Sequence, residues 1–199
     1  MEELVSKLIT EGALKSESVI NAFININRKY FVLPEYGEEA CNDYPLPIGF
    51  GQTISQPYTV AFMLELLEVE EDSKILDIGS GSGWTTAMLA EIAKEGHVFG
   101  VEKVPELVSL GRNNLSRYKF KNAEIIEAGV NLGLGKEAPF DRILVSAAAK
   151  RIPEELLDQL KIGGIMVVPV NRCIYKITKV SATEIRTEKH SGFYFVPLK

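Results

Sequence analysis

The chain has 199 residues, of which 46% are hydrophobic and 25% are charged, a composition typical of globular domains. Its formal net charge of −5 argues against the basic surface that holds phosphate backbones, so we expect no nucleic-acid partner. The two cysteines, Cys41 and Cys173, lie far apart without the CxxC spacing of a zinc site, so we expect reduced thiols and no metal.

The N-terminal part predicts two short helices and then a long irregular segment. Apolar residues recur at helical spacing around Leu4 and Leu8, and again around Val19 and Phe23. A basic start and a long apolar run are both missing, so we expect a cytoplasmic protein without a signal peptide or a membrane partner. Residues 31–57 are rich in proline and glycine, which predicts an irregular segment, and their interleaved aromatic residues indicate packing rather than disorder.

From residue 58 onward, helical and strand patterns alternate. We expect helices over 60–67, 84–94 and 105–117 and from Pro153, and strands over 74–78, 97–102, 123–128, 141–147 and 163–170. Such alternation predicts an α/β fold with a doubly wound, mostly parallel sheet that is covered on both faces. The segments CIYKITKV, TEIRTEK and GFYFVPL within 172–199 are expected as antiparallel strands at the sheet edge.

The same patterns indicate a single domain over residues 1–199, without repeats. Residues 1–57 would supply the N-terminal helices and a segment that covers the substrate and cofactor. Residues 58–171 would form the cofactor-binding core, and residues 172–199 the C-terminal strands.

The densest motif is ILDIGSGSGW, residues 75–84. A short apolar strand ends at Asp77, and Gly79, Gly81 and Gly83 follow before a helix begins. Glycines permit positive φ and let a ligand approach the backbone closely, so a glycine loop between a strand and a helix predicts a nucleotide-type cofactor site. The spacing GxGxG after Asp77 resembles the first motif of class I methyltransferases, which have a Rossmann-like fold.

Glu102 ends the next predicted strand, about twenty residues after the glycine loop, as nucleotide-binding βαβ units require. A carboxylate there can accept hydrogen bonds from both ribose hydroxyls and disfavours a 2′-phosphate. Glu102 alone is compatible with NAD as well as with S-adenosylmethionine, and the loop spacing favours the second cofactor.

Beyond this loop, the chain resembles the protein-L-isoaspartate (D-aspartate) O-methyltransferases over roughly residues 28–198. The segment YPLPIGFGQTISQP (44–57) is similar to the hallmark region of that family. Further similar segments follow in the family's order: APFDRILVSAAA (138–149), IPEELLDQLKIGG (152–164), MVVPV (166–170) and FVPL (195–198). The resemblance implies transfer of the methyl group of S-adenosylmethionine to the free carboxylate of L-isoaspartyl residues in damaged proteins and peptides.

The resemblance also implies roles for individual residues. Ser55 would contact the acceptor carboxylate, with Thr53 and Tyr58 in the substrate site; capping of the helix after Pro57 is an alternative role for Ser55. The implied cofactor-binding residues are Ile54, Asp77, Gly79, Ser80, Gly81, Gly83, Glu102, Lys103, Gly129 and Val130. Trp84 fits the core and the cofactor wall equally well. A carboxylate is already an anionic nucleophile, so positioning rather than a general base would carry catalysis.

The sequence departs from the family pattern at three places. Tyr58 stands where the family has histidine, and the turn after MVVPV lacks a glutamine. Ala128, Gly129 and Val130 stand where the family carries Gly-Asp-Gly, whose aspartate holds the adenine amine. Loss of that hydrogen bond would cost roughly 1.5–3 kcal/mol of cofactor affinity, unless Glu127 substitutes for it.

We expect a monomer whose partners are isoaspartyl-containing proteins and peptides. Two other functions stay open: a carboxyl O-methyltransferase with another peptide or small-molecule acceptor, and a pseudoenzyme that only binds S-adenosylmethionine. A nucleic-acid amino-methyltransferase is disfavoured, because residues 146–149 read SAAA where such enzymes carry a motif like Asn-Pro-Pro-Tyr.

Overall fold

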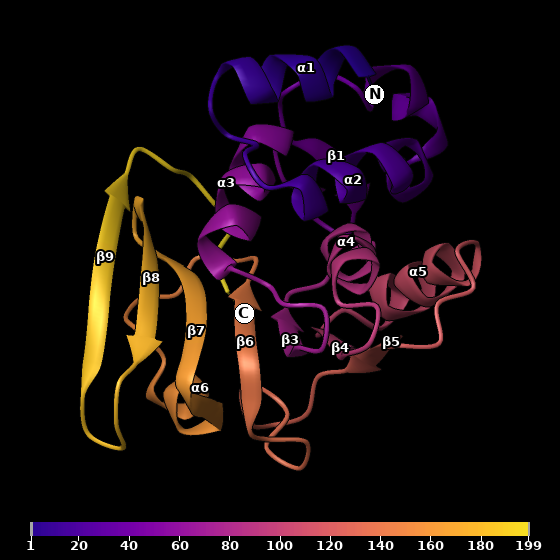
Figure 1. Ribbon diagram of the computed structural model, residues 1–199. Helices are drawn as coiled ribbons and strands as arrows, with labels where there is room; N and C mark the ends of the chain where they lie inside the picture. Colours follow the sequence, from indigo (N-terminus) through magenta and orange to yellow (C-terminus); the bar gives the residue numbers. More distant parts are fainter. Residues whose placement is uncertain (1, 199) are drawn as a thin grey trace.

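The computed structural model describes residues 2–198, and within that range a seven-stranded sheet forms the centre of the molecule (Figure 1). The spatial order is β5 (Ala123–Glu127), β4 (His97–Glu102), β3 (Lys74–Ile78), β6 (Phe140–Val145), β7 (Leu160–Val170), β8 (Cys173–Lys179) and β9 (Ile185–Ser191). Neighbours from β5 to β7 run parallel, and β8 and β9 are antiparallel. The predicted mostly parallel sheet with an antiparallel edge is confirmed.

The strand order reverses at β3. The chain runs outward from β3 to β4 and β5, and then returns to place β6 on the other side of β3. Asp77 of β3 therefore pairs with Gly100 on one side and with Leu144 on the other. In such sheets, ligands bind in the crevice at the carboxyl ends of the strands, where the order reverses.

The two faces of the sheet are covered unequally. One face packs against α3 (Pro57–Leu67), α4 (Trp84–Ile92) and α5 (Pro105–Ser116). The other face is covered by the short α6 (Glu154–Gln159) and by the segment that follows β5. Side chains alternate between the faces as strand geometry requires, so Ile75 points toward the helices and Leu76 toward the opposite side. None of the helices in residues 2–198 is long and apolar enough to cross a membrane.

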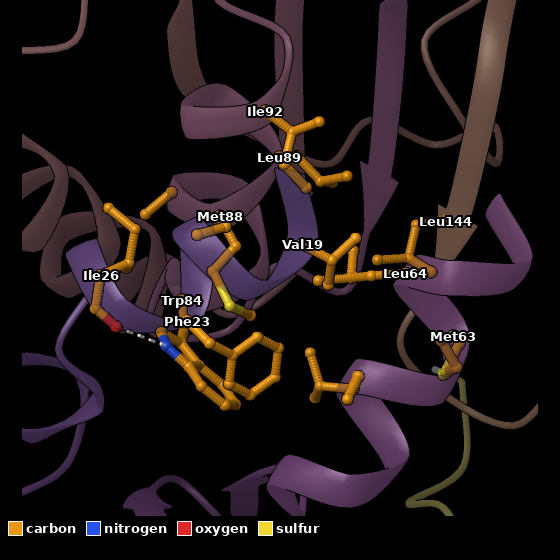
Figure 2. Packing of buried hydrophobic residues seen from close by; sticks show 14 of the residues in the cluster. Val19, Phe23, Ile26, Met63, Leu64, Trp84, Met88, Leu89, Ile92 and Leu144 are labelled. Carbon is orange, nitrogen blue, oxygen red and sulfur yellow. Dashed lines mark hydrogen bonds between the residues drawn. The ribbon is translucent and has the colours of Figure 1, made fainter. Parts of the chain in front are cut away.

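The N-terminal helices α1 (Glu2–Thr10) and α2 (Glu17–Asn25) form a further layer above α3 and α4 (Figure 1). Phe23 of α2 meets the edge of the Trp84 ring, with 5.7 Å between the ring centroids. The indole of Trp84 donates to the carbonyl of Ile26 at 3.4 Å, as Figure 2 shows, and Trp84 is 1% exposed. Trp84 is therefore a core residue that joins the N-terminal layer to the sheet.

The segment predicted as irregular contains more structure than expected. The 3₁₀ helix η1 (Arg28–Phe31) leads into it. The segment itself includes a second short 3₁₀ helix, η2 (Pro34–Glu39), and an antiparallel hairpin of β1 (Leu46–Gly49) and β2 (Gln52–Ile54). Gly49, Phe50 and Gly51 all have positive φ at the tip, which closes the turn. The hairpin carries the TIS sequence over the carboxyl ends of the strands.

The predicted strand GFYFVPL is wrong. After β9, Gly192 has a φ of 103° and the chain leaves the sheet edge. Residues 193–198 return toward the carboxyl end of β6 (Figure 1), where Ala148 donates to the carbonyl of Val196 at 2.8 Å and accepts from Leu198 at 2.9 Å. Pro197 has no backbone N–H for a strand ladder, so the segment forms a short bridge in place of an edge strand.

Candidate active site

A cavity opens at the carboxyl ends of the parallel strands, where the strand order reverses. Its walls come from the hairpin, from the ends of β3, β4, β5 and β6, and from the C-terminal segment. They are formed by Ile48, Gln52, Thr53, Ile78, Gly79, Gly81, Val101, Glu102, Lys103, Val104, Ala128, Gly129, Val130, Asn131, Leu132, Gly133, Ser146, Ala147, Val196, Pro197 and Leu198. The cavity contains the predicted cofactor residues Gly79, Gly81, Glu102, Lys103, Gly129 and Val130. We call it the cofactor cavity.

The glycines of the loop after β3 have different structural roles. Gly79 and Gly81 line the cofactor cavity with φ values of 75° and 54°. A Cβ on Gly81 would lie 3.1 Å from the side chain of Ile48 and would narrow the cavity. Gly83 begins α4 away from the cavity walls, and a Cβ there would lie 3.3 Å from the carbonyl of Gly111. Gly83 therefore allows the close packing of α4 on α5, and its contact with the cofactor stays a prediction.

Glu102 joins the loop to the end of β4. One carboxylate oxygen, Oε2, accepts from the backbone N–H of Gly81 at 2.9 Å. The other, Oε1, accepts from the backbone N–H groups of Lys103 at 2.8 Å and Val104 at 2.9 Å. Its side chain also lines the cofactor cavity. Because an ionised carboxylate has about four acceptor positions and three are used here, Glu102 can hold the loop and still accept from one ribose hydroxyl.

Asp77 lies behind the loop, outside the described walls of the cofactor cavity. It is fully buried. The hydroxyls of Thr85 and Thr86 both donate to its Oδ2 at 2.7 Å, and Ser146 donates to Oδ1 at 3.4 Å. Burial raises the pKa of Asp77 to about 6, and the hydroxyl donors partly oppose this rise. Asp77 therefore fixes β3 to α4, and its direct contact with the cofactor stays a prediction.

The buried carboxyl of Asp77 should make stability depend on pH. Its pKa is about 6 in the folded chain against an ordinary 3.8, so the folded state holds the proton more tightly. The tighter proton binding adds up to about 3 kcal/mol to the free energy of unfolding. This stabilisation is fully present below pH 4 and is lost as the pH rises through 6. We expect Asp77→Asn to unfold at higher urea concentration than the wild type at pH 7.5, with the difference vanishing near pH 4. The exposed Asp72→Asn is the control, and an equal shift in both variants would contradict the assignment.

A second space, the acceptor groove, adjoins the cofactor cavity. Its walls are Pro45, Thr53, Ser55, Gln56, Tyr58, Thr59, Ser146, Ser191, Gly192, Phe193, Tyr194, Phe195 and Val196. It brings together the predicted substrate residues Thr53, Ser55 and Tyr58. Within residues 2–198, the hydroxyl of Ser55 forms no hydrogen bond, so it is available to a ligand in the groove. A smaller space shares walls with both, and Ile54 and Ser80 line it.

The alternative role of Ser55 as a helix cap is wrong. The residue before α3 is Gln56, and Asp43 accepts from the backbone N–H of Tyr58 at 2.8 Å. Asp43 also accepts from the Gln56 side chain at 3.1 Å. The N-terminus of α3 is thus satisfied from the segment that precedes the hairpin, which leaves the Ser55 side chain free to face the groove.

Arg28 was missed by the sequence analysis. It is fully buried, and its guanidinium lies 5.3 Å from the Trp84 ring centroid. Its Nη1 and Nη2 atoms donate to the backbone carbonyls of Ala40, Asn42, Tyr44 and Ser55 at 2.9–3.2 Å. Burial lowers the pKa of Arg28 to about 10, so it stays charged at neutral pH. Arg28 fixes the backbone of Ser55, although no local motif distinguishes it from a surface arginine.

The loop after β5 closes the end of the cofactor cavity opposite the hairpin. Gly129, Val130 and Asn131 are all exposed residues that line it. Glu127 is exposed and lies outside the described walls, so its predicted substitution for the family's aspartate is not supported by its position. Asn131 is the polar side chain that this loop presents instead.

Comparison with known proteins gives one consistent match. The family model described as protein-L-isoaspartate(D-aspartate) O-methyltransferase matches residues 1–199. The chain is similar to the protein-L-isoaspartate O-methyltransferase of Thermococcus onnurineus, with 44% identity over 98% of this chain and 90% of that protein. The enzyme of the same name from Ignicoccus hospitalis is 42% identical over 98% of this chain and 95% of that protein.

Among solved structures, the chain is similar to a Plasmodium falciparum protein described as a protein-L-isoaspartate O-methyltransferase in complex with S-adenosyl-L-homocysteine. The TM-score is 0.87 and the identity 29%, over 99% of this chain and 97% of that chain.

Proposed function

The chain belongs to the protein-L-isoaspartate(D-aspartate) O-methyltransferase family, and we propose that it transfers the methyl group of S-adenosylmethionine to the free carboxylate of L-isoaspartyl residues. Damaged proteins and peptides that contain such residues are its substrates. The observation that carries this proposal is the pair of adjoining spaces: Glu102 and the glycine loop line one, and Ser55 faces the other.

The residues of the cofactor cavity fit S-adenosylmethionine. Gly79 and Gly81 have no side chain, so the ligand can lie directly against their backbone. A Cβ on Gly81 would obstruct this contact. Glu102 and the loop around Gly129 would hold the ribose and the adenine. The bound cofactor supplies an electrophilic methyl group on a cationic sulfur.

The chain's own contribution is positioning. A carboxylate is deprotonated at neutral pH, so no side chain has to remove a proton before transfer. The Ser55 hydroxyl would donate to one oxygen of the acceptor carboxylate and direct the other toward the cofactor cavity. The hairpin and the C-terminal segment would exclude water, which strengthens these interactions.

The test uses methyl-labelled S-adenosylmethionine and two peptides that differ only in an isoaspartyl or an aspartyl residue. We expect base-labile label on the isoaspartyl peptide alone. Label on neither peptide, from protein that still binds S-adenosylhomocysteine in a titration, would overturn isoaspartate as the acceptor.

Ser55→Ala should lower kcat/KM for the isoaspartyl peptide by about 10- to 100-fold, because one hydrogen bond to a charged acceptor is lost. Ser55 lines the acceptor groove rather than the cofactor cavity, so the affinity for S-adenosylhomocysteine should stay unchanged. Ser109→Ala, an exposed serine on α5, is the control. A Ser55→Ala enzyme with wild-type kcat/KM would remove Ser55 from the proposal.

Gly129→Asp should raise the affinity for S-adenosylhomocysteine about tenfold, because a charged acceptor for the adenine amine is worth roughly 1.5–3 kcal/mol. A Cβ on Gly129 meets nothing within 4 Å, so the site can take the side chain. Gly135→Asp adds the same charge at an equally open position and should change nothing. Calorimetric titration of both variants decides whether this loop faces the adenine.

We also propose that the chain is one catalytic domain that acts as a cytoplasmic monomer without a nucleic-acid partner. The net charge of −5 supports the exclusion of nucleic acid. Residues 1–57 would cover the substrate, residues 58–171 would bind the cofactor, and residues 172–199 would complete the groove. Light scattering of the purified protein at several concentrations tests the monomer.

A further inference from the structure

Ser146 lies where the cofactor cavity and the acceptor groove meet. Ser146 and Thr53 line both of these spaces and also the smaller space between them, and Val196 lines the two larger ones. Reacting atoms must approach to about 3–3.5 Å before transfer, so donor and acceptor must come together at this shared wall. Ser55 lines the groove and the smaller space. Ser146 therefore lines the wall that the cofactor cavity and the acceptor groove share, whereas Ser55 does not line the cofactor cavity.

The sheet fixes the backbone of Ser146. It follows the last residue of β6, and its N–H donates to the carbonyl of Ile78 at 2.8 Å. Ile78 is the last residue of β3, so Ser146 sits on the two strands between which the sheet order reverses. A side chain at this point has a fixed origin and faces the crevice where ligands bind.

The hydroxyl of Ser146 is weakly held by its partner Asp77. Its donor–acceptor distance to Asp77 Oδ1 is 3.4 Å, whereas Thr85 and Thr86 reach Oδ2 at 2.7 Å. In a strong hydrogen bond from a hydroxyl to a carboxylate, the two oxygens lie about 2.5–2.7 Å apart. Ser146 as a residue is half-buried. It can therefore turn toward a better acceptor in the groove without breaking a strong interaction.

We propose that Ser146 is a second hydroxyl donor to the acceptor carboxylate, supplied by the sheet opposite Ser55 of the hairpin. The inference rests on the proposed function and deepens it. Two donors from separate elements would fix the orientation of the carboxylate, which one donor leaves free to rotate. Neither hydroxyl transfers its proton, so both serine side chains are unchanged by the reaction. Asp77 is a positioning residue that keeps the Ser146 hydroxyl near this orientation until the acceptor binds.

The test measures binding separately from methyl transfer. The isoaspartyl peptide is titrated calorimetrically into protein saturated with S-adenosylhomocysteine, for the wild type, Ser146→Ala, Ser146→Thr and Ser55→Ala. We expect Ser146→Ala to bind the peptide about tenfold more weakly, because a hydrogen bond to a charged group is lost. Ser146→Thr keeps the hydroxyl and should stay within about threefold of the wild type. The affinity of both Ser146 variants for S-adenosylhomocysteine is measured first, so that the peptide is titrated into saturated protein, and cooperative urea unfolding shows that the variants are folded.

Different failures have different meanings. If Ser146→Ala binds the peptide as tightly as the wild type while Ser55→Ala binds it weakly, the second donor does not exist and the proposed function stands. Equal weakening in Ser146→Ala and Ser146→Thr would show that shape rather than the hydroxyl matters, and would also overturn the inference. A wild type that binds S-adenosylhomocysteine but not the isoaspartyl peptide would overturn the proposed function, and this inference with it.

Discussion

Glu102→Gln is expected to weaken the binding of S-adenosylhomocysteine about a thousandfold, which corresponds to roughly 4 kcal/mol. Both oxygens of Glu102 accept backbone N–H groups, from Gly81 on one side and from Lys103 and Val104 on the other. A glutamine must point its NH₂ group at one of these donors. The variant therefore distorts the glycine loop and also loses the charged acceptor for the ribose, each worth roughly 1.5–3 kcal/mol.

The adjacent strand offers a matched control for this prediction. Glu127 of β5 pairs in register with Glu102 and is exposed, outside the described walls of the cofactor cavity. Glu127→Gln removes the same charge one strand away and should leave the affinity within about twofold. Calorimetric titration of both variants with S-adenosylhomocysteine shows whether affinity depends on the hydrogen bonds of Glu102 or only on the net charge of the protein. Equal weakening in both would refute the specific role.

Replacement of Arg28 by methionine should lower the free energy of unfolding by about 3–5 kcal/mol. The variant leaves the buried carbonyl of Ala40 and the partly buried carbonyls of Tyr44 and Ser55 without their donor. It also removes the guanidinium from the face of Trp84. Methionine fills most of the volume of the arginine side chain, so the lost free energy of unfolding comes from hydrogen bonds more than from packing.

Urea unfolding measures this loss, and Arg117→Met is the control. Arg117 is exposed and also stacks on an aromatic ring, with its guanidinium 5.5 Å from the Tyr30 centroid. Its replacement should change the free energy of unfolding by less than about 0.5 kcal/mol. Arg28→Lys should not restore stability, because a single ammonium group cannot reach carbonyls on both sides of the planar fork. A stable Arg28→Met protein would show that water replaces the guanidinium.

The regular part of the fold could be predicted from the sequence because its signals are local. Apolar strands and the glycine loop each fix the conformation of their own residues. β3 and β4 therefore have the predicted bounds, and Glu102 lies beside the loop as its position at a strand end requires. The carboxyl ends of parallel strands converge, so placing these residues in one crevice needs no knowledge of side-chain packing.

The remaining features depend on contacts between distant segments. The bonds of Arg28 depend on the path of residues 40–55, which no periodicity reveals. The family resemblance implies a cofactor-binding role for Asp77, yet its carboxylate accepts from the hydroxyls of Thr85 and Thr86 on α4 in the interior. The final segment has the alternation of a strand, but Ala148 supplies its partners and redirects it across the sheet. In each case the deciding group lies far away in the sequence or directly after the motif.

The outermost strand has a consequence for an enzyme whose clients are damaged chains. β9 ends the sheet at one side, and most of its side chains are exposed, including Arg186, Glu188 and Lys189. An unfolded segment that paired with this edge would have to strip water from those charges, which disfavours strand addition. The enzyme can therefore meet partly unfolded proteins without offering a template on which they would aggregate.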